Sequence, residues 1–159
     1  MKFERFEDLP VWKDSISLAA SIFKMTRDKR FLGLGDISNQ IQRAGLSISN
    51  NIAEGFERGT TQELISFLYY ARGSAGEVRS ILWVMERLDV LNDLRSEISN
   101  LRSVAEAISR QIRGWSASLQ NTPIRGQRYL NDQTKSIFEQ GKSRKAFEET
   151  LRQYYQPQR

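Results

Sequence analysis

LRSEISNLRSVAEAISRQIRGWSASL, residues 94–119, carries apolar side chains at alternating steps of four and three residues. Those side chains are Leu94, Ile98, Leu101, Ala105, Ile108, Ile112, Trp115 and Leu119. A period of about 3.5 residues is typical of an amphipathic helix that packs nearly parallel to its neighbours with a left-handed twist. The stretch therefore predicts one long helix of a bundle, beginning after Asn92 or Asp93.

The same spacing occurs near the start of the chain. A helix is predicted over about residues 9–30, with Asp8 as its cap and Pro10 in its first turn. Its apolar stripe consists of Leu9, Trp12, Ile16, Ala19 and Phe23. Gly33 and Gly35 mark the end of this helix and the turn into the next one.

Two further helices fill the interval up to residue 85. One is capped by Asp36 or Ser38 and ended by Gly55, and its stripe consists of Ile37, Ile41, Ala44, Ile48 and Ile52. The other begins at Thr60, with Glu63 completing a capping box. The stripe of that helix consists of Leu64, Leu68, Ala71, Ala75, Val78, Leu82 and Met85.

Proline is absent between Val11 and Thr122, which suits a long helical body. Four amphipathic helices with short connections and no alternating strand pattern predict an all-α, up-down-up-down four-helix bundle over residues 1–120. Asn121 and Pro123 mark a break before a C-terminal extension, residues 121–159. A short helix over about residues 143–155 is predicted in that extension.

The composition excludes most catalytic chemistry. The 159 residues contain no Cys and no His, so disulfides, thiolates, zinc and haem sites and imidazole bases are ruled out. A Walker sequence is also lacking. We therefore expect no enzyme activity, catalytic residue, cofactor or metal site. We expect a cytoplasmic protein, because the start is unlike a secretory signal and no apolar stretch approaches the roughly 20 residues that span a bilayer.

Positive charge exceeds negative charge, with 24 Lys plus Arg against 19 Asp plus Glu. Two of the predicted helices carry arginines in tracks, and these are Arg72, Arg79, Arg95, Arg102, Arg110 and Arg113. The planar guanidinium makes bidentate contacts with phosphate, so such tracks are candidate nucleic-acid-binding residues. The alternative is a solvated or salt-bridged surface, because acidic residues share the same helices. Those acidic residues are Glu77, Glu86, Asp93, Glu97 and Glu106.

The extension is a second candidate surface for nucleic acid. Residues 121–159 carry eight basic and four acidic side chains. The candidate binding residues there are Arg125, Arg128, Lys142, Arg144 and Lys145. Aromatic residues interleave with them and could stack on unpaired bases. Alternatively, Phe147, Leu151 and Tyr154 share a helical face and simply pack a terminal helix.

The second predicted helix has a polar stripe next to its apolar one. The residues proposed for a structural polar network are Gln40, Arg43, Ser47, Asn51 and Glu54. Glu54 is the expected acceptor, with Arg43 or Arg58 as donor, and Glu54→Ala is predicted to loosen the fold or the assembly. The small residues Gly45 and Ser49 allow close approach of a neighbour. The alternative is that the stripe is only the solvated side of the helix.

Several separated blocks of the sequence resemble one known family. The blocks comprise Phe6, Leu9, Val11 and Trp12; Gln40, Arg43, Ala44, Ser47, Ile48, Asn51-Ile52-Ala53-Glu54-Gly55 and Arg58; and Phe67, Leu68, Ala71, Gly73-Ser74 and Glu77. They resemble the four-helix-bundle family of large-subunit (23S) rRNA intervening-sequence proteins and accessory variability determinants of diversity-generating retroelements. The resemblance implies a homopentameric barrel. In the retroelement branch it also implies a basic surface that binds nucleic acid and a partner reverse transcriptase.

Two functions follow as hypotheses. The first is a non-enzymatic accessory protein whose arginine surface holds RNA, or an RNA/DNA hybrid, and docks a reverse transcriptase. The second is an oligomeric scaffold of the rRNA intervening-sequence type that binds other proteins without contacting nucleic acid. Neither hypothesis involves a membrane.

Overall fold

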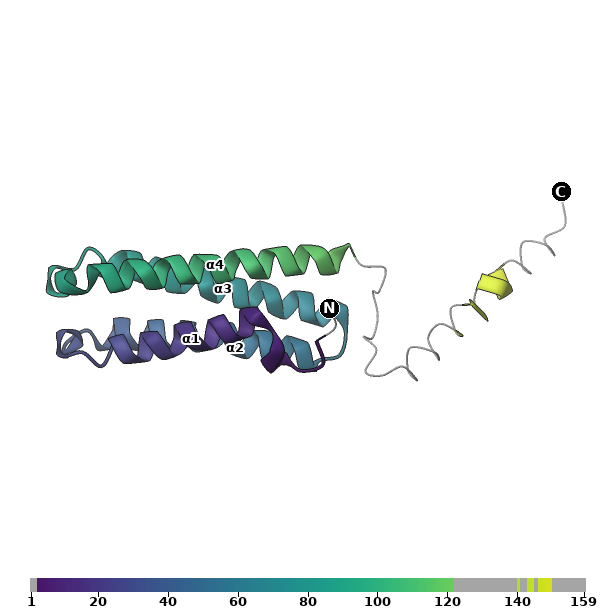
Figure 1. Ribbon diagram of the computed structural model, residues 1–159, viewed down its shortest axis with the longest axis horizontal. Helices are drawn as coiled ribbons and strands as arrows, with labels where there is room; N and C mark the ends of the chain where they lie inside the picture. Colours follow the sequence, from purple (N-terminus) through teal and green to yellow (C-terminus); the bar gives the residue numbers. More distant parts are fainter. Residues whose placement is uncertain (1–2, 122–139, 141–142, 145, 150–159) are drawn as a thin grey trace. The chain divides into compact units, whose positions relative to one another are not determined.

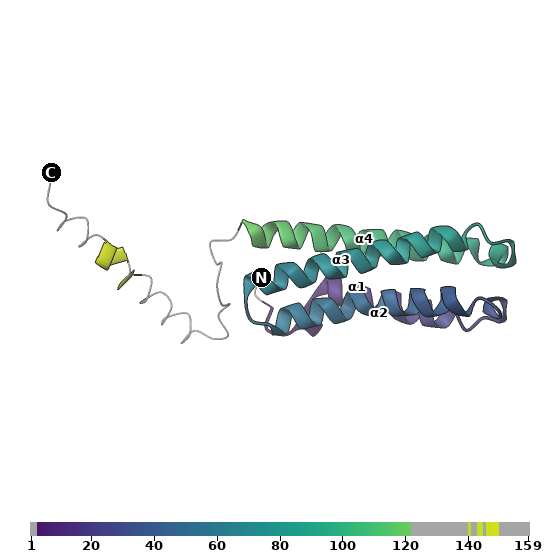
Figure 2. The ribbon, with the colours of Figure 1, turned by 180° about the vertical axis from the view of Figure 1, so that it is seen from behind.

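The computed structural model describes residues 3–121, 140, 143–144 and 146–149. Its four long helices are α1 (Pro10–Met25), α2 (Gly35–Glu57), α3 (Thr61–Met85) and α4 (Arg95–Gln120). The helices lie side by side, as Figure 1 shows from one side and Figure 2 from behind. Consecutive helices pack on one another and α4 also packs on α1, so the predicted all-α, up-down-up-down four-helix bundle is confirmed.

The chain divides into two compact units, Met1–Gln127 and Arg128–Arg159. The first unit contains the bundle. In the second, residues 140, 143–144 and 146–149 are helical, and most of the predicted helix over residues 143–155 lies outside the described residues. Among the described residues, no helix is both long enough and apolar enough to cross a membrane.

The core is formed by the predicted stripes of three helices. All seven stripe residues of α3 are buried, from Leu64 to Met85. Four of the five in α2 are buried, with Ile37 only partly so. In α4 the stripe is buried from Leu94 to Ile112, and Trp115 and Leu119 are half-buried at its end. These helices were predictable because apolar side chains recur at helical spacing along each buried face, and the buried Ser49, Thr61 and Ser116 do not interrupt the predicted stripes.

The predicted stripe of α1 is correct at Leu9 and Ala19, which are buried, and wrong at its other three positions. Ile16 is exposed and Trp12 and Phe23 are only partly buried, whereas the core side chains are Val11, Leu18, Ala19, Ile22 and Met25. Ser15 completes this face and is fully buried. Its hydroxyl donates to the carbonyl of Val11 at 2.6 Å, which satisfies the polar group within the helix. A serine in the middle of the stripe made the correct face look polar.

Several predicted helix boundaries are also wrong. Neither Asp8 nor Asp36 or Ser38 caps a helix, because Leu9 and Leu34 occupy the N-cap positions of α1 and α2 without side-chain bonds. The first helix ends at Met25 rather than residue 30, and a 3₁₀ turn η2 (Lys29–Phe31) follows it. Thr60 caps α3 as predicted: its hydroxyl accepts from the backbone N–H of Glu63 at 3.2 Å and donates to the Glu63 carboxylate.

Gly55 does not end α2 but lies inside it. A Cβ atom placed on Gly55 would lie 2.6 Å from the Cβ of Phe67 and 3.3 Å from a methyl of Leu64. Gly55 is therefore required for the close packing of α2 on α3. Gly45 has a milder version of the same role against α1, where a Cβ would lie 3.0 Å from Ile22.

The turns η2 and η3 (Asp89–Leu94) lie at the same end of the bundle (Figure 1). Arg30 connects them, because its Nη1 lies 3.4 Å from Asp93 while its Nε and Nη2 each donate to Asp28 at 2.8 Å. This doubly bonded guanidinium holds the pKa of the Asp28 carboxyl well below its usual range. The α3–α4 turn is thus fixed to the α1–α2 turn by one side chain.

Candidate nucleic-acid interface

The two predicted arginine tracks meet on one face of the bundle. Three contacts join α3 to α4 along their length: Glu86 with Arg102, Arg79 with Glu106, and Tyr69 with Gln120. On α3, Arg72 falls between Tyr69 and Arg79 in the sequence. On α4, Arg113 falls between Glu106 and Gln120. Both therefore lie between the second and third contacts, because the helices are antiparallel.

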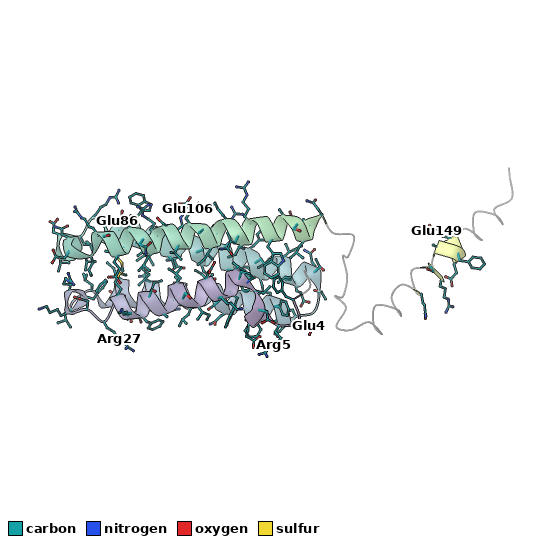
Figure 3. The ribbon with its side chains drawn as sticks, in the orientation of Figure 1. Glu4, Arg5, Arg27, Glu86, Glu106 and Glu149 are labelled. Atoms are coloured by element: carbon teal, nitrogen blue, oxygen red, sulfur yellow. The ribbon has the colours of Figure 1, made fainter. Side chains whose placement is uncertain are left out.

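We call this surface the α3/α4 arginine face. It consists of Arg72, Arg79, Arg95, Arg102, Arg110 and Arg113. Figure 3 shows the two glutamates of the face, Glu86 and Glu106, along one side of the bundle and Arg27 on the other side.

Three of the six arginines of the face are paired with two carboxylates. Arg102 lies 3.2 Å from Glu86. Glu106 accepts from Arg110 at 2.9 Å and lies 3.9 Å from Arg79. The alternative interpretation, a salt-bridged surface, is therefore the correct one for these three arginines. The Nε of Arg79 is buried and has no hydrogen-bond partner among the described residues.

The other half of the face is open. Arg72, Arg95 and Arg113 are exposed, and none of them makes an ion pair within the described part of the chain. No side-chain hydrogen bond within residues 3–121 engages their guanidinium groups, so among these residues their donors remain for an external anion. Together with the exposed Arg110, these residues give the face an excess of positive charge.

Sequence reasoning missed Trp83, which lies with two arginines at the end of the arginine face near the α3–α4 turn. Trp83 is 44% exposed, and the guanidinium carbons of Arg102 and Arg87 lie 3.8 and 5.0 Å from the centre of its ring. Arg87 also donates to the Trp83 carbonyl at 2.7 Å. The spacing of Trp83 and Arg87, one helical turn apart, was a local signal. The contact of Arg102 with Trp83 could not be predicted in this way, because it depends on how α3 and α4 are aligned along their length.

The polar stripe of α2 forms a smaller network than predicted. Asn51 donates to the carbonyl and the hydroxyl of Ser47, at 2.7 and 3.0 Å. Ser74 of α3, which was not among the predicted residues, donates to the Ser47 hydroxyl at 2.9 Å. This chain of bonds crosses from α2 to α3, so part of the stripe is an inter-helix network.

The remaining three predicted members lie outside this network. Glu54 accepts from Arg58 at 2.6 Å in an exposed pair within α2, and this bond raises the pKa of the Arg58 guanidinium. Arg58 thus proves to be the donor, and Arg43 is not. The side chains of Gln40 and Arg43 are exposed and make no hydrogen bond within residues 3–121. For them the solvated-side interpretation is correct.

The candidate residues of the extension are mostly outside the described residues, and these are Arg125, Arg128, Lys142 and Lys145. Arg144 is described, and its Nε donates to Glu148 at 3.0 Å within one helical turn.

The comparisons with known proteins point to one family. A family model described as 23S rRNA-intervening sequence protein matches residues 7–114, which is more than half of the 159 residues. The match covers α1, α2, α3 and most of α4. No curated protein shows a significant match to the sequence.

Proposed function

The chain belongs to the 23S rRNA-intervening sequence protein family, and we propose that it is a nucleic-acid-binding accessory protein that catalyses no reaction. The observation that carries the proposal is the open half of the α3/α4 arginine face. Three exposed arginines without carboxylate partners in the described residues lie on one surface. Such an arrangement suits a phosphate backbone and provides no base-specific readout.

The test is the salt dependence of RNA binding. Each phosphate contact contributes a slope of about −0.7 to −0.9 to log K against log salt. A triple variant, Arg72→Gln with Arg95→Gln and Arg113→Gln, should therefore bind more weakly. Its slope should be shallower by about two to three units for one protomer's contacts. No binding by the wild type at low salt, or a flat salt response, rejects the proposal.

A control with the same loss of charge separates the face from the net charge. The exposed basic residues of α1, α2 and the turn between them serve this purpose, in the triple variant Lys13→Gln, Arg27→Gln and Arg43→Gln. This control should lose little affinity, because long-range attraction is screened beyond about 10 Å at 0.1 M salt. Equal losses in the two triple variants would show that the binding surface is not the arginine face.

The proposal includes assembly into a homopentamer. Large apolar side chains remain exposed on the protomer, including Leu46, Tyr70 and Val84. Tyr70 and Val84 are 14 positions apart, four turns of helix, so both face the same side of α3. Exposed apolar side chains on one side of a helix suit a subunit interface. Sedimentation equilibrium should give five times the protomer mass, and a variant with Tyr70→Ser and Val84→Ser should dissociate; a monomeric wild type would contradict the assembly.

The proposed protein partner is a reverse transcriptase. The observation that tests it is genomic: an adjacent reverse-transcriptase gene with template and variable repeats supports the partner. A location inside a ribosomal RNA gene favours instead the scaffold that binds proteins without contacting nucleic acid.

A further inference from the structure

An open depression of about 490 Å³ lies at the turn end of the arginine face. Its lining consists of Trp83, Glu86, Arg87, Arg95, Ser99 and Arg102. Phosphate contacts alone do not account for it, because the flat surface of an indole ring offers no donor to a phosphate. The depression therefore calls for a ligand that has an aromatic or apolar part as well as negative charge.

The groups around the depression match the two parts of a nucleotide. Trp83 is 44% exposed, and the guanidinium of Arg102 stacks on its ring at 3.8 Å while that of Arg87 lies at 5.0 Å, so the ring and the stacked guanidinium together form a flat platform. Bases stack both on tryptophan rings and on guanidinium planes. Arg95 is exposed in the same lining and is free of ion pairs within residues 3–121, so its donors are available for a phosphate.

Glu86 argues against a depression that attracts a polyanion by positive charge alone. Glu86 is the acidic residue of the lining, its side chain is 15% exposed, and it is engaged with Arg102. The pair orients Arg102 beside Trp83, and Arg87 and Arg95 are the arginines of the lining that make no ion pair within residues 3–121. A site built only to attract a polyanion would not need the ring.

We infer that the Trp83 depression binds one unpaired nucleotide of a single-stranded nucleic acid, with the base stacked on the platform formed by Trp83 and Arg102 and the phosphate contacting Arg95. The inference rests on the proposed function and gives it a substrate class. Bases in a duplex are already stacked on their neighbours and cannot enter such a site without unpairing. The protein therefore prefers single strands to duplexes of the same length.

The test compares a labelled oligoadenylate with the duplex it forms with oligouridylate, by fluorescence anisotropy on the full chain at low salt. Trp83→Leu should weaken binding of the single strand roughly five- to 150-fold, the range found when one stacking aromatic side chain is removed. Binding of the duplex should change by less than about twofold. Trp83→Phe keeps an aromatic surface and should retain most of the affinity.

A matched control is the same substitution elsewhere in the bundle. Trp12→Leu removes a tryptophan that packs edge-on against Phe6, at the other end of α1 from the turns, and should leave single-strand binding unchanged. A thermal melt of each variant establishes that it is folded. If folded Trp83→Leu binds the single strand as well as wild type does, or loses single strand and duplex equally, the inference is wrong. Failure of wild type to bind either probe would instead reject the proposed function.

Discussion

The guanidinium carbon of Arg102, on α4, lies 3.8 Å from the centre of the Trp83 ring, on α3. The same guanidinium lies 3.2 Å from Glu86, and the Arg102 side chain is 22% exposed. Arg102 thus combines a cation–π contact with an ion pair across two helices, in a partly desolvated position where such contacts are stronger than at the surface. This contact fixes the end of α3 to the first turns of α4.

Arg102→Lys should destabilise the bundle by about 0.5–1 kcal/mol. Lysine keeps the charge but loses the planar group that stacks on Trp83 and the fork that reaches Glu86. Urea unfolding measures the difference. Arg110→Lys is the control, because within the described residues Arg110 makes only an exposed pair with Glu106 four residues away, and its effect should stay below about 0.5 kcal/mol. Equal effects of the two substitutions would remove the special role of Arg102.

Glu106→Gln should strengthen nucleic-acid binding. Glu106 forms an ion pair with Arg110 at 2.9 Å and lies 3.9 Å from Arg79. Removing its charge therefore leaves both arginines available to bind phosphate. Affinity for RNA at low salt should rise about two- to fivefold, the size of a surface ion pair that no longer competes. Glu57→Gln changes the net charge equally at an exposed position of α2 and should have a smaller effect. Weaker binding by Glu106→Gln would contradict the proposed interface.

Gly55→Ala should be among the more harmful small substitutions in the chain. The new Cβ would lie 2.6 Å from the Cβ of Phe67, an atom attached directly to the backbone of α3, so the two helices must separate. We expect a loss of about 1–3 kcal/mol, typical of overpacking. Gly114→Ala is the opposite case: a Cβ there meets nothing within 4 Å, and α4 should gain about 0.5–1 kcal/mol. A stabilising Gly55→Ala, measured by urea unfolding, would show that the helices are not in close contact.

The contrast between α1 and α3 shows what the sequence could predict. All seven predicted stripe residues of α3 are buried, so periodicity identified this face apart from Thr61 and Ile65 in the first turns. In α1 the buried Ser15 interrupts the true stripe, and a hydroxyl satisfied by its own helix cannot be distinguished from an exposed one by pattern. The start of α2 was missed because its N-cap, Leu34, makes no side-chain hydrogen bond to the helix, so the sequence carries no capping signal there.

The candidate site was predictable only in part. Helical spacing placed the arginines in two tracks, and the structure brings the tracks together. Which arginines remain open depends on the register of α3 against α4, because Glu86 and Glu106 are paired across that contact. The partnership of Trp83 with Arg102 depends on the same register. No periodicity within one helix contains this information.

Glu54→Ala is now expected to have little effect, contrary to the expectation from the sequence. Its bond to Arg58 is exposed on both sides and lies within one helix, so its removal should cost less than about 0.5 kcal/mol. Ser74→Ala should cost more, about 0.5–1.5 kcal/mol, because it removes the bond from α3 to Ser47 in α2. Thermal melting of the two variants decides which residue belongs to the inter-helix network. A larger loss for Glu54→Ala would restore the original interpretation.

Asp28→Asn should make stability less dependent on acid pH. Arg30 holds the pKa of Asp28 below its unfolded value, so the charged form is favoured in the folded state. This contribution is complete above a pH of about 4 and is lost as the pH falls toward the folded pKa. The variant should therefore be less stable than wild type at pH 7, and the difference should narrow progressively below a pH of about 4.

The Asp28→Asn substitution removes the charge of Asp28 but keeps its role as the N-cap of η2. The amide side chain retains an oxygen for the backbone N–H of Arg30, a bond that the Asp28 carboxylate now accepts at 2.9 Å. Asp93→Asn is the control, because it removes the longer, more exposed contact of Arg30 and should lower stability at pH 7 by less. Urea titrations at a series of pH values measure both variants. A difference between wild type and Asp28→Asn that widens in acid would reverse the sign of the argument, because the charged carboxylate would then be the less favoured form in the folded state.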